Sequence, residues 1–275
     1  MPELPEIVCR AREMNQALVG RRIELIEVLQ PKCLNVPAEA FEKGLSGAEI
    51  VGVTHRGKWL FVETTQGHLL INMGMGGELL LLPSSAPPEK WRVKLGFAED
   101  EADERSMALF ANFWWFGNTH YVQPGGLADH AMTAKLGPNA LDLSADEFAE
   151  LLSGKRGRIK SFLLDQSKIA GIGNAYIHDI LFRAKLHPLR AIFAMSDADV
   201  ARLHEAIRVE LQRSIDKGAA AYELSLHGER GGFGAEDLII GYREGKPCPE
   251  CGTTIEKIKT GSTAGFICPV CQPAS

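Results

Sequence analysis

The spacing of apolar residues divides the chain into a strand-rich first half and a helical second half. Residues 5–18 carry apolar side chains at helical spacing, among them Ile7, Met14 and Leu18, which predicts a leading helix. From residue 22 to about 122 the pattern changes to short apolar or alternating runs such as IELIEVL, KWLFVET and MALFANFWWF, separated by glycine, proline or charged residues. Many short strands at this spacing are typical of a β-sandwich or a barrel-like domain.

After residue 125 helical patterns dominate. Ser144 followed by Glu147 predicts a capping box at the start of the run DEFAELL. Residues 158–188 contain two helical patterns separated by the turn IAGIGN, and residues 197–217 have the pattern of one long amphipathic helix. The glycine-rich segment HGERGGFGAED that follows predicts a loop. We therefore divide the chain into residues 1–125, 126–240 and 241–275.

Four of the six cysteines lie near the C-terminus, in two C-x2-C pairs with 16 residues between them. A spacing of two residues lets both thiolates of a pair reach one ion, and two such pairs complete a tetrahedron. The pattern predicts one zinc ion, bound by Cys248, Cys251, Cys268 and Cys271. Four cysteine ligands leave no open coordination position, so the zinc is expected to be structural and to supply most of the folding energy of this tail. The alternative, two disulfides, requires an oxidising compartment.

Composition narrows the class of protein. An apolar fraction of 45% and a charged fraction of 24% are those of an ordinary soluble globular protein. No apolar run approaches the roughly 18 residues of a membrane span, and the start MPELPEIVCR lacks the features of a signal peptide. We therefore expect a cytoplasmic protein with no membrane partner. The net charge of −5 excludes a generally basic surface but allows a local basic groove, expected mainly in the less acidic second half.

Three motifs follow one another in an order and spacing that resemble a known family. They are PELPE at the N-terminus, GIGNAYIHDILFRAKLHP in the helical region and the four-cysteine ribbon at the C-terminus. Together they resemble the formamidopyrimidine-DNA glycosylase and endonuclease VIII family over essentially the whole chain. The resemblance implies an α+β fold with an N-terminal β-sandwich led by a helix, a helix–two-turn–helix region and a zinc ribbon. It also implies a monomeric bacterial enzyme of base-excision repair that acts on damaged double-stranded DNA as a glycosylase and lyase.

The candidate catalytic residues are Pro2, Glu3, Glu6 and Lys58. Removal of Met1, which a small second residue permits, would leave Pro2 with a free secondary amine. Because the unperturbed pKa of an α-amino group is about 7.7 to 8, much of this amine is neutral and nucleophilic near neutral pH. Glu3 and Glu6 lie within four residues of it and are expected to carry protons. The resemblance implies that Glu3 is the general acid and base, and that Lys58 helps to protonate the sugar and contacts phosphate.

The resemblance further implies which side chains enter the DNA. Met75 and Phe116 match the residues that fill the space left by a base turned out of the helix, and flanking glycines favour exposed loops for both. The loop of Phe116 commonly reads D-P-R-R-F-G in the family, and its first arginine reads the base opposite the lesion. Here Trp114 and Trp115 stand in place of the two arginines. Trp114 is therefore expected to stack on the opposite base without reading its edge.

Phosphate contacts are expected from the helical region. Asn174 matches the asparagine that binds the phosphate of the damaged nucleotide in the family. It is also expected to cap the following helix, at a turn whose backbone N–H groups would cradle the phosphate. The basic run of residues 155–160 is expected to supply positive charge just before this turn, from Lys155, Arg156, Arg158 and Lys160.

The ribbon departs from the family pattern at one position. The arginine that usually stands five residues before the third ribbon cysteine, where it grips phosphates, is replaced by Thr263. Lys257 and Lys259 are expected to supply charge in its place, although not its two-pronged geometry. The loss of the usual arginines at Thr263 and at Trp114 leaves open a second interpretation, a paralogue that binds lesion-bearing or kinked DNA with little or no glycosylase activity. A third, a zinc-ribbon protein-interaction module unrelated to DNA, requires the N-terminal match to be chance.

Overall fold

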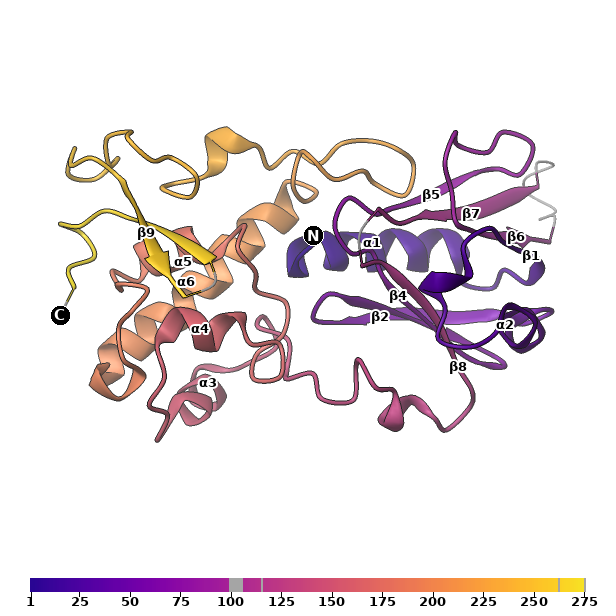
Figure 1. The fold of residues 1–275 in the computed structure, drawn as a ribbon, viewed down its shortest axis with the longest axis horizontal. Coiled ribbons are helices and arrows are strands. Elements are labelled where there is room, and N and C mark those ends of the chain that lie inside the picture. Colours follow the sequence, from indigo (N-terminus) through magenta and orange to yellow (C-terminus); the bar gives the residue numbers. More distant parts are fainter. Residues whose placement is uncertain (99–105, 115, 262, 275) are drawn as a thin grey trace. The chain divides into compact units, whose positions relative to one another are not determined.

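The computed structural model describes residues 1–98, 106–114, 116–261 and 263–274. The chain forms two compact units (Figure 1). The first unit contains residues 1–135 and 218–232, and the second contains residues 136–217 and 233–275. The segment 218–232 is thus part of the first unit, although it follows the helical region in the sequence.

The described residues of the first unit form the expected leading helix and two four-stranded antiparallel sheets, with strand orders β2-β3-β4-β8 and β1-β6-β7-β5. The helix α1 spans Leu4–Leu18, and the strands are β1 (Ile23–Val28), β2 (Ile50–Arg56), β3 (Trp59–Thr64), β4 (Gly67–Asn72), β5 (Glu78–Pro83), β6 (Val93–Phe97), β7 (Met107–Asn112) and β8 (Asn118–Val122). One apolar core takes residues from both sheets and from α1, so the prediction of a β-sandwich led by a helix is confirmed.

The helix α1 packs along β2 in the opposite direction. The Ile7, Met14 and Leu18 side chains are fully buried in the core, as their helical spacing predicts. Both amide atoms of the Asn15 side chain bind the backbone of Val53, and the Val53 N–H to Asn15 Oδ1 distance is 2.9 Å. Because the C-terminal end of α1 lies beside the start of β2, its N-terminal end points to where β2 ends.

Short helical elements in the first unit were not predicted from the sequence. The helix α2 spans Ala38–Leu45, and 3-10 turns cover Pro31–Cys33 and Leu127–Asp129. In α2 only Phe41 and Leu45, four residues apart, are buried. One apolar pair in an eight-residue helix gives too little periodicity to stand out among short strands.

The second unit contains the expected helices and the ribbon hairpin. Its elements are α3 (Ala145–Leu152), α4 (Ile159–Leu164), α5 (Ile177–Arg183), α6 (Asp197–Asp216), two 3-10 turns (Ile192–Ala194 and Ala235–Asp237), and the strands β9 (Glu256–Thr260) and β10 (Thr263–Ile267). The predicted capping box of α3 is confirmed, because the Ser144 N–H donates to Glu147 Oε2 at 2.8 Å and the Glu147 N–H donates to Ser144 Oγ. In the parts of the chain that the structure describes, no helix is long and apolar enough to cross a membrane.

The ribbon shares its core with α5. Phe182 packs with Ile255 and Phe266 of the ribbon and with two of its cysteines. The buried Asp179 carboxylate accepts three backbone N–H bonds, from residues 239–241, at 2.8 to 2.9 Å. These contacts fix the chain that leads into the ribbon against the helix.

Candidate active site and DNA-binding surfaces

Three loops and the start of α1 meet at one end of the sandwich. The β2–β3 turn holds Lys58, the β4–β5 loop holds Met75, and the β7–β8 loop holds Trp114 and Phe116. Antiparallel pairing of β2 with β3, β3 with β4 and β4 with β8 brings these loops to the same end. Since α1 runs opposite to β2, Pro2 lies at this end too.

The start of α1 is built around two buried carboxyl groups. Glu3 precedes the first helical residue and is 4% exposed, and Glu6 is 3% exposed. The Glu3 N–H donates to Glu6 Oε2 at 2.8 Å, and the Ala220 N–H donates to Glu6 Oε1 at 3.3 Å. Glu6 thus positions Glu3 and joins the helix start to the segment 218–232. Pro2, also buried, directly precedes this pair, and we call Pro2, Glu3 and Glu6 the amino-terminal head.

The segment 218–232 is held against α1 and the edge strand β5. The Leu226 N–H donates to Glu13 Oε2 at 2.8 Å, and the same carboxylate oxygen accepts from Arg10 Nη1 at 2.6 Å. The Leu226 carbonyl accepts from the Leu81 N–H of β5 at 2.8 Å. Sequence reasoning identified only a glycine-rich loop here, because the partners are more than 100 residues away in the chain.

A third carboxyl group, that of Glu223, faces the head from this segment. Burial, and next the charge of Glu6, raise the pKa of Glu223 from 4.5 to about 7. Arg10 and the chain's amino terminus act in the opposite direction. Between these two pKa values the folded protein binds more protons at Glu223 than the unfolded chain does. The free energy of unfolding therefore falls as the pH rises through this window, and the effect is complete above about pH 7.

We therefore expect Glu223→Gln to gain stability relative to the wild type at alkaline pH. The quantity to compare is the free energy of unfolding of the variant minus that of the wild type. This difference should be about 1–3 kcal/mol larger at pH 8 than at pH 5. Urea unfolding of both proteins at the two pH values measures this difference. Glu24→Gln, at an exposed position of β1, is the matched control and should show no such change. Equal differences at both pH values for Glu223→Gln would mean that burial and the charge of Glu6 do not raise the pKa of this carboxyl group.

Lys58 lies half-buried in a rigid turn. Its carbonyl accepts a hydrogen bond from Asn72 Nδ2 at 2.8 Å, and the preceding Gly57 adopts φ 57°, a left-handed conformation that favours glycine. The next residue, Trp59, is buried against the rings of His120 and His130. The ammonium group of Lys58 has no ion-pair or hydrogen-bond partner in the described part of the chain. It is therefore available to a ligand at this end of the sandwich.

Large apolar side chains project from the two neighbouring loops. Met75 is 51% exposed, Trp114 66% and Phe116 78%. Phe116 adopts φ 57°, which is uncommon for an aromatic residue and typical of functional sites. The loop is anchored by buried Phe113, which lies so close under Gly117 that an added Cβ would approach its ring to 2.4 Å. Trp115 lies outside the described residues.

In the second unit, one expectation for the turn before α5 is wrong. Asn174 does not cap α5, because the residue at the N-cap is Tyr176 and no side chain makes a capping bond there. The N–H of Gly171 is also not free for a phosphate, since it donates to Gln166 Oε1 at 2.9 Å. The Asn174 side-chain oxygen is buried and has no partner among the described residues. The Asn174 side-chain oxygen therefore makes no hydrogen bond that stabilises the described part of the fold.

The basic run of residues 155–160 is divided by burial. Lys155 and Arg158 are exposed, whereas Lys160 is 2% exposed and cannot contribute to a basic surface. The Lys160 ammonium donates to Thr260 Oγ1 at 2.8 Å, to Thr263 Oγ1 at 3.1 Å and to the Ala264 carbonyl. Burial lowers the pKa of Lys160 to about 8. The expectation that Lys160 adds surface charge is therefore wrong, and this residue fixes α4 to the ribbon hairpin.

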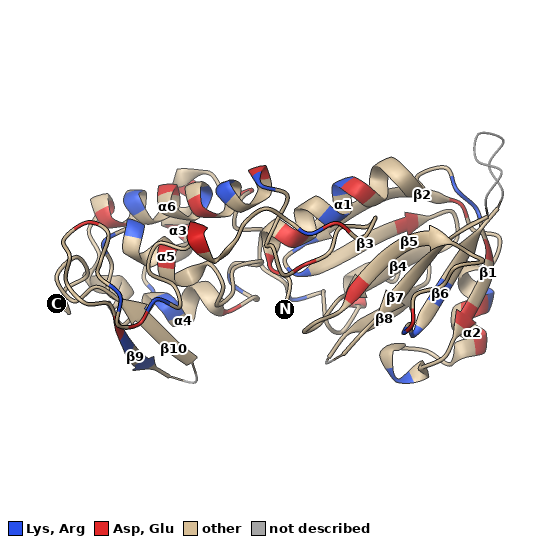
Figure 2. Ribbon diagram, turned by 90° about the horizontal axis from the view of Figure 1, so that it is seen from above, with Lys and Arg blue, Asp and Glu red and all other residues tan. Residues whose placement is uncertain are grey.

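The hairpin presents its basic residues on one side. Lys257 and Lys259 are exposed and, two residues apart on β9, lie on the same face of the strand. Figure 2 shows basic residues in blue on β9. The Thr263 hydroxyl points inward to Lys160 instead. The hairpin therefore exposes two lysines. Thr263, which stands where the family has an arginine, accepts a hydrogen bond from buried Lys160.

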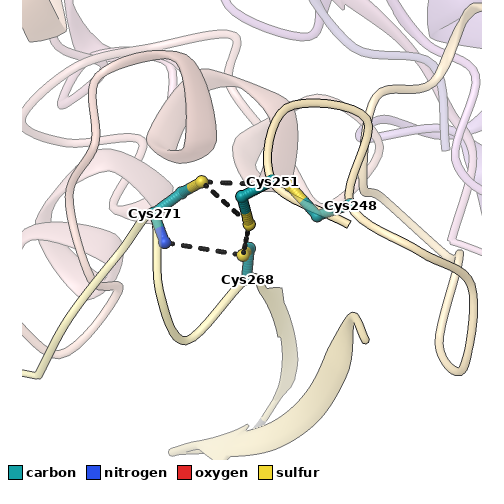
Figure 3. A group of neighbouring side chains, drawn as sticks. All are labelled: Cys248, Cys251, Cys268 and Cys271. Carbon is teal, nitrogen blue, oxygen red and sulfur yellow. Dashed lines mark hydrogen bonds between the residues drawn. The ribbon is translucent and has the colours of Figure 1, made fainter. Parts of the chain in front are cut away.

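The four ribbon cysteines converge on one point (Figure 3). Their Sγ atoms lie within 4.8 Å of one another, with distances of 3.4 Å between Cys251 and Cys268, 3.6 Å between Cys251 and Cys271 and 3.9 Å between Cys248 and Cys271. Tetrahedral zinc with Zn–S bonds of about 2.3 Å requires sulfurs about 3.8 Å apart, whereas a disulfide requires about 2.05 Å. The donor set and its spacing fit a four-coordinate metal ion.

Three family models match consecutive stretches of the chain. The formamidopyrimidine-DNA glycosylase N-terminal domain matches residues 1–111, the formamidopyrimidine-DNA glycosylase H2TH domain matches residues 136–225, and the zinc finger found in FPG and IleRS matches residues 245–274. The chain belongs to the formamidopyrimidine-DNA glycosylase family. Membership confirms the α+β fold and the order of sandwich, helix–two-turn–helix region and zinc-finger ribbon.

Relatives in the formamidopyrimidine-DNA glycosylase family match over nearly the full length. The formamidopyrimidine-DNA glycosylases of Symbiobacterium thermophilum and Magnetococcus marinus are each 34% identical to this chain, covering 99% and 100% of it and 90% and 100% of their own lengths. The Lactococcus lactis Fpg in complex with an abasic site containing DNA has a TM-score of 0.86 at 29% identity. MutM in complex with carbocyclic 8-oxo-G containing DNA has a TM-score of 0.87 at 29% identity. Both alignments cover 99% of this chain and 100% of the solved one.

Proposed function

We propose that this protein is a bifunctional DNA glycosylase and lyase of base-excision repair, which removes oxidised or ring-opened bases and then cleaves the strand. The observation that carries the proposal is the amino-terminal head, where Pro2 precedes two buried carboxyl groups at the loop end of the sandwich. A protein that only binds DNA has no use for buried acids beside a terminal amine. The head therefore favours an enzyme over a catalytically inert paralogue.

The reaction uses the secondary amine of Pro2 after removal of Met1. Its lone pair attacks the sugar C1′, the bond from C1′ to the base breaks, and the base leaves with a proton. The nitrogen then gives up its proton, the bond from C1′ to O4′ breaks and O4′ takes up a proton, which opens the sugar ring. The product is an iminium ion between Pro2 and the opened sugar, and this ion acidifies the proton on C2′. Loss of this proton expels the 3′ phosphate in a β-elimination, and a second elimination expels the 5′ phosphate. Water then adds to C1′ of the remaining iminium ion, and the sugar remnant leaves as an aldehyde, which regenerates the amine.

Proton transfer is assigned to Glu3 and Lys58. Glu3 protonates the departing group and later accepts a proton, while Glu6 holds the Glu3 backbone in place through its N–H. The sequence offers Glu6 as a second proton carrier, and its two contacts with backbone N–H groups support a positioning role for this residue. The ammonium group of Lys58 lies at the same end of the sandwich and has no partner among the described residues; it donates to the sugar oxygen or to a phosphate.

The duplex is held by both units. Met75 and Phe116 fill the space of the extruded nucleotide, and their exposure on loops at the same end of the sandwich supports this role. Phosphates are bound by Asn174 and by the exposed cations Lys155, Arg158, Lys257 and Lys259. The protein acts as a monomer on damaged double-stranded DNA in the bacterial cytoplasm.

The four-cysteine cluster holds one structural zinc ion. Zinc supplies the bonds that fold the two cysteine turns, and it takes no part in the reaction because all four positions are filled by thiolates. Backbone bonds support each turn, from the Gly252 N–H to the Cys248 carbonyl and from the Gln272 N–H to the Cys268 carbonyl, both at 2.9 Å. The ribbon in turn presents Lys257 and Lys259 to the DNA.

Glu3→Gln is expected to lower the excision of an intact damaged base by a factor of about 100 to 10,000, because the departing base loses its proton donor. The measurement is single-turnover cleavage of a duplex that carries 8-oxoguanine or an oxidised pyrimidine. Cleavage at a preformed abasic site, where no base has to leave, should fall less. Glu24→Gln serves as the control and should behave as the wild type. Unchanged excision by Glu3→Gln would remove this residue from the mechanism, and a wild type that binds lesions without cleaving them would favour the inert paralogue.

A further inference from the structure

A pocket lies at the loop end of the sandwich, separate from the amino-terminal head. The residues that line it include Gln30, Lys32, Arg92, Trp114, Phe116 and Asn118. They come from the turn after β1, the start of β6 and the β7–β8 loop. None of its lining residues belongs to α1 or to the segment 218–232.

The walls of this pocket are fixed by backbone hydrogen bonds. The Arg92 N–H donates to the Ala111 carbonyl at 2.7 Å, and the Arg92 carbonyl accepts from the Leu29 N–H at 2.8 Å. Cys33 Sγ donates to the Gln30 carbonyl at 3.0 Å, which closes the turn that carries Lys32. The segments that carry Lys32 and Arg92 are therefore held in place by the fold, and binding at these two residues requires little ordering of their backbone.

The chemistry of the pocket combines two cations with two aromatic side chains. Lys32 and Arg92 are exposed, and neither forms an ion pair with any residue that the structure describes. No aspartate or glutamate is among the described residues that line the pocket, although the chain as a whole has a net charge of −5. Trp114 and Phe116 expose 66% and 78% of their surface beside these cations. Aromatic faces next to cations are the combination that binds a nucleotide by stacking its base and neutralising its phosphate.

Strand order places the pocket on the opposite side of the β7–β8 loop from the head. In the sheet β1-β6-β7-β5, the pocket adjoins the end of β1 and the start of β6. The segment 218–232, which contacts the head through Ala220, adjoins the far edge strand β5. The loop of Trp114 and Phe116 follows β7, between the two. This order allows a duplex that has its damaged nucleotide at the head to place its other strand at the pocket.

We propose that this pocket binds the undamaged strand opposite the lesion, with Lys32 and Arg92 on its phosphates and the indole of Trp114 against a base. The proposal rests on the proposed function for the position of the damaged strand. In this proposal the undamaged strand is bound through the charges of Lys32 and Arg92 and through stacking on Trp114. Trp114 offers one N–H donor and a large ring face, so the identity of the opposite base should have little effect.

The first test removes the two cations together. In Lys32→Gln/Arg92→Gln, the slope of log binding constant against log salt concentration for a lesion-bearing duplex should become shallower by about two units, since each lost phosphate contact removes about 0.9. The affinity for the duplex should fall about 10- to 100-fold at moderate salt. Affinity for the same damaged strand without its complement should not change. Lys43→Gln/Arg22→Gln, at exposed positions of the same unit outside the pocket, is the charge-matched control and should match the wild type in both measurements.

The second test varies the base opposite the lesion. Single-turnover excision by the wild type should differ less than about tenfold among cytosine, adenine, guanine and thymine, and Trp114→Ala should weaken duplex binding with all four. An unchanged salt slope in the double variant, or an equal loss for single and double strands, would overturn the assignment of the pocket to the undamaged strand. A hundredfold preference of the wild type for cytosine would overturn the role of Trp114. The salt dependence of the binding constant does not require cleavage. A protein that binds DNA without cleaving it would therefore contradict the proposed enzyme activity and still allow the test of the pocket.

Discussion

Replacement of Pro2 by glycine should lower strand cleavage at an abasic site by a factor of at least about 100, the scale on which loss of an activated nucleophile acts. A primary amine at this position still reaches the site, but it lacks the ring that fixes the direction of the lone pair at the start of α1. Pro2 is buried and directly precedes the Glu3–Glu6 contact, so its ring also holds the helix start. The measurement is single-turnover strand cleavage on an abasic duplex, with DNA affinity measured in parallel.

A blocked amino terminus provides the sharper comparison. If a short extension is left before Pro2, its nitrogen becomes part of an amide, and an amide nitrogen is not nucleophilic because its lone pair is delocalised into the carbonyl. This protein should bind abasic DNA and show no cleavage above background. The same extension at the C-terminus is the control and should leave cleavage unchanged. Full activity of the blocked protein would exclude the terminal amine as the nucleophile.

Substitution of a ribbon cysteine should remove the metal and most of the DNA affinity. Structural zinc contributes an apparent binding free energy of about 10–16 kcal/mol in small zinc modules, far more than the shared core of the ribbon with Phe182 can replace. We expect Cys268→Ser to contain little zinc, where the wild type contains about one ion per chain. Loss of the hairpin removes Lys257 and Lys259 and frees Lys160, so the affinity for duplex DNA should fall more than about 100-fold.

Metal analysis and DNA titration on the same preparations test this prediction. Cys9→Ser, at a half-buried cysteine of α1 outside the cluster, is the matched control and should retain its zinc. A wild type with far less than one metal ion per chain would exclude the zinc site. A Cys268→Ser variant with normal metal content would exclude the cysteine from the ligand set.

Features encoded by local spacing could be predicted from the sequence. The leading helix, the sandwich strands, the capping box at Ser144 and the four-cysteine cluster each depend on residues close together in the chain. The catalytic and DNA-binding residues came from the resemblance to a family, and their roles stay predictions, as do the boundaries between the three parts of the chain. Their positions are compatible with those roles, since Met75 and Phe116 project from exposed loops at the same end as Lys58.

Features that depend on distant partners could not be predicted. The bond between Ala220 and Glu6 joins residues 214 positions apart, and no periodicity in either segment indicates it. The basic run predicts an exposed cation at Lys160. Its partner Thr260 in the ribbon lies 100 positions away in the chain, and the ribbon contacts bury it. The pocket beside Trp114 is likewise assembled from three separate segments. In each case the tertiary fold, and not the local pattern, decides what the side chain contacts.

The measurement that tests the central claim most directly is borohydride reduction of the wild-type protein with abasic-site DNA, followed by mass spectrometric mapping of the adduct. Borohydride converts the iminium ion into a stable amine and so joins protein and DNA covalently. We predict one adduct, on the N-terminal peptide, at the nitrogen of Pro2 in chains that have lost Met1. An adduct on a lysine such as Lys58, or no adduct at all, would contradict the account.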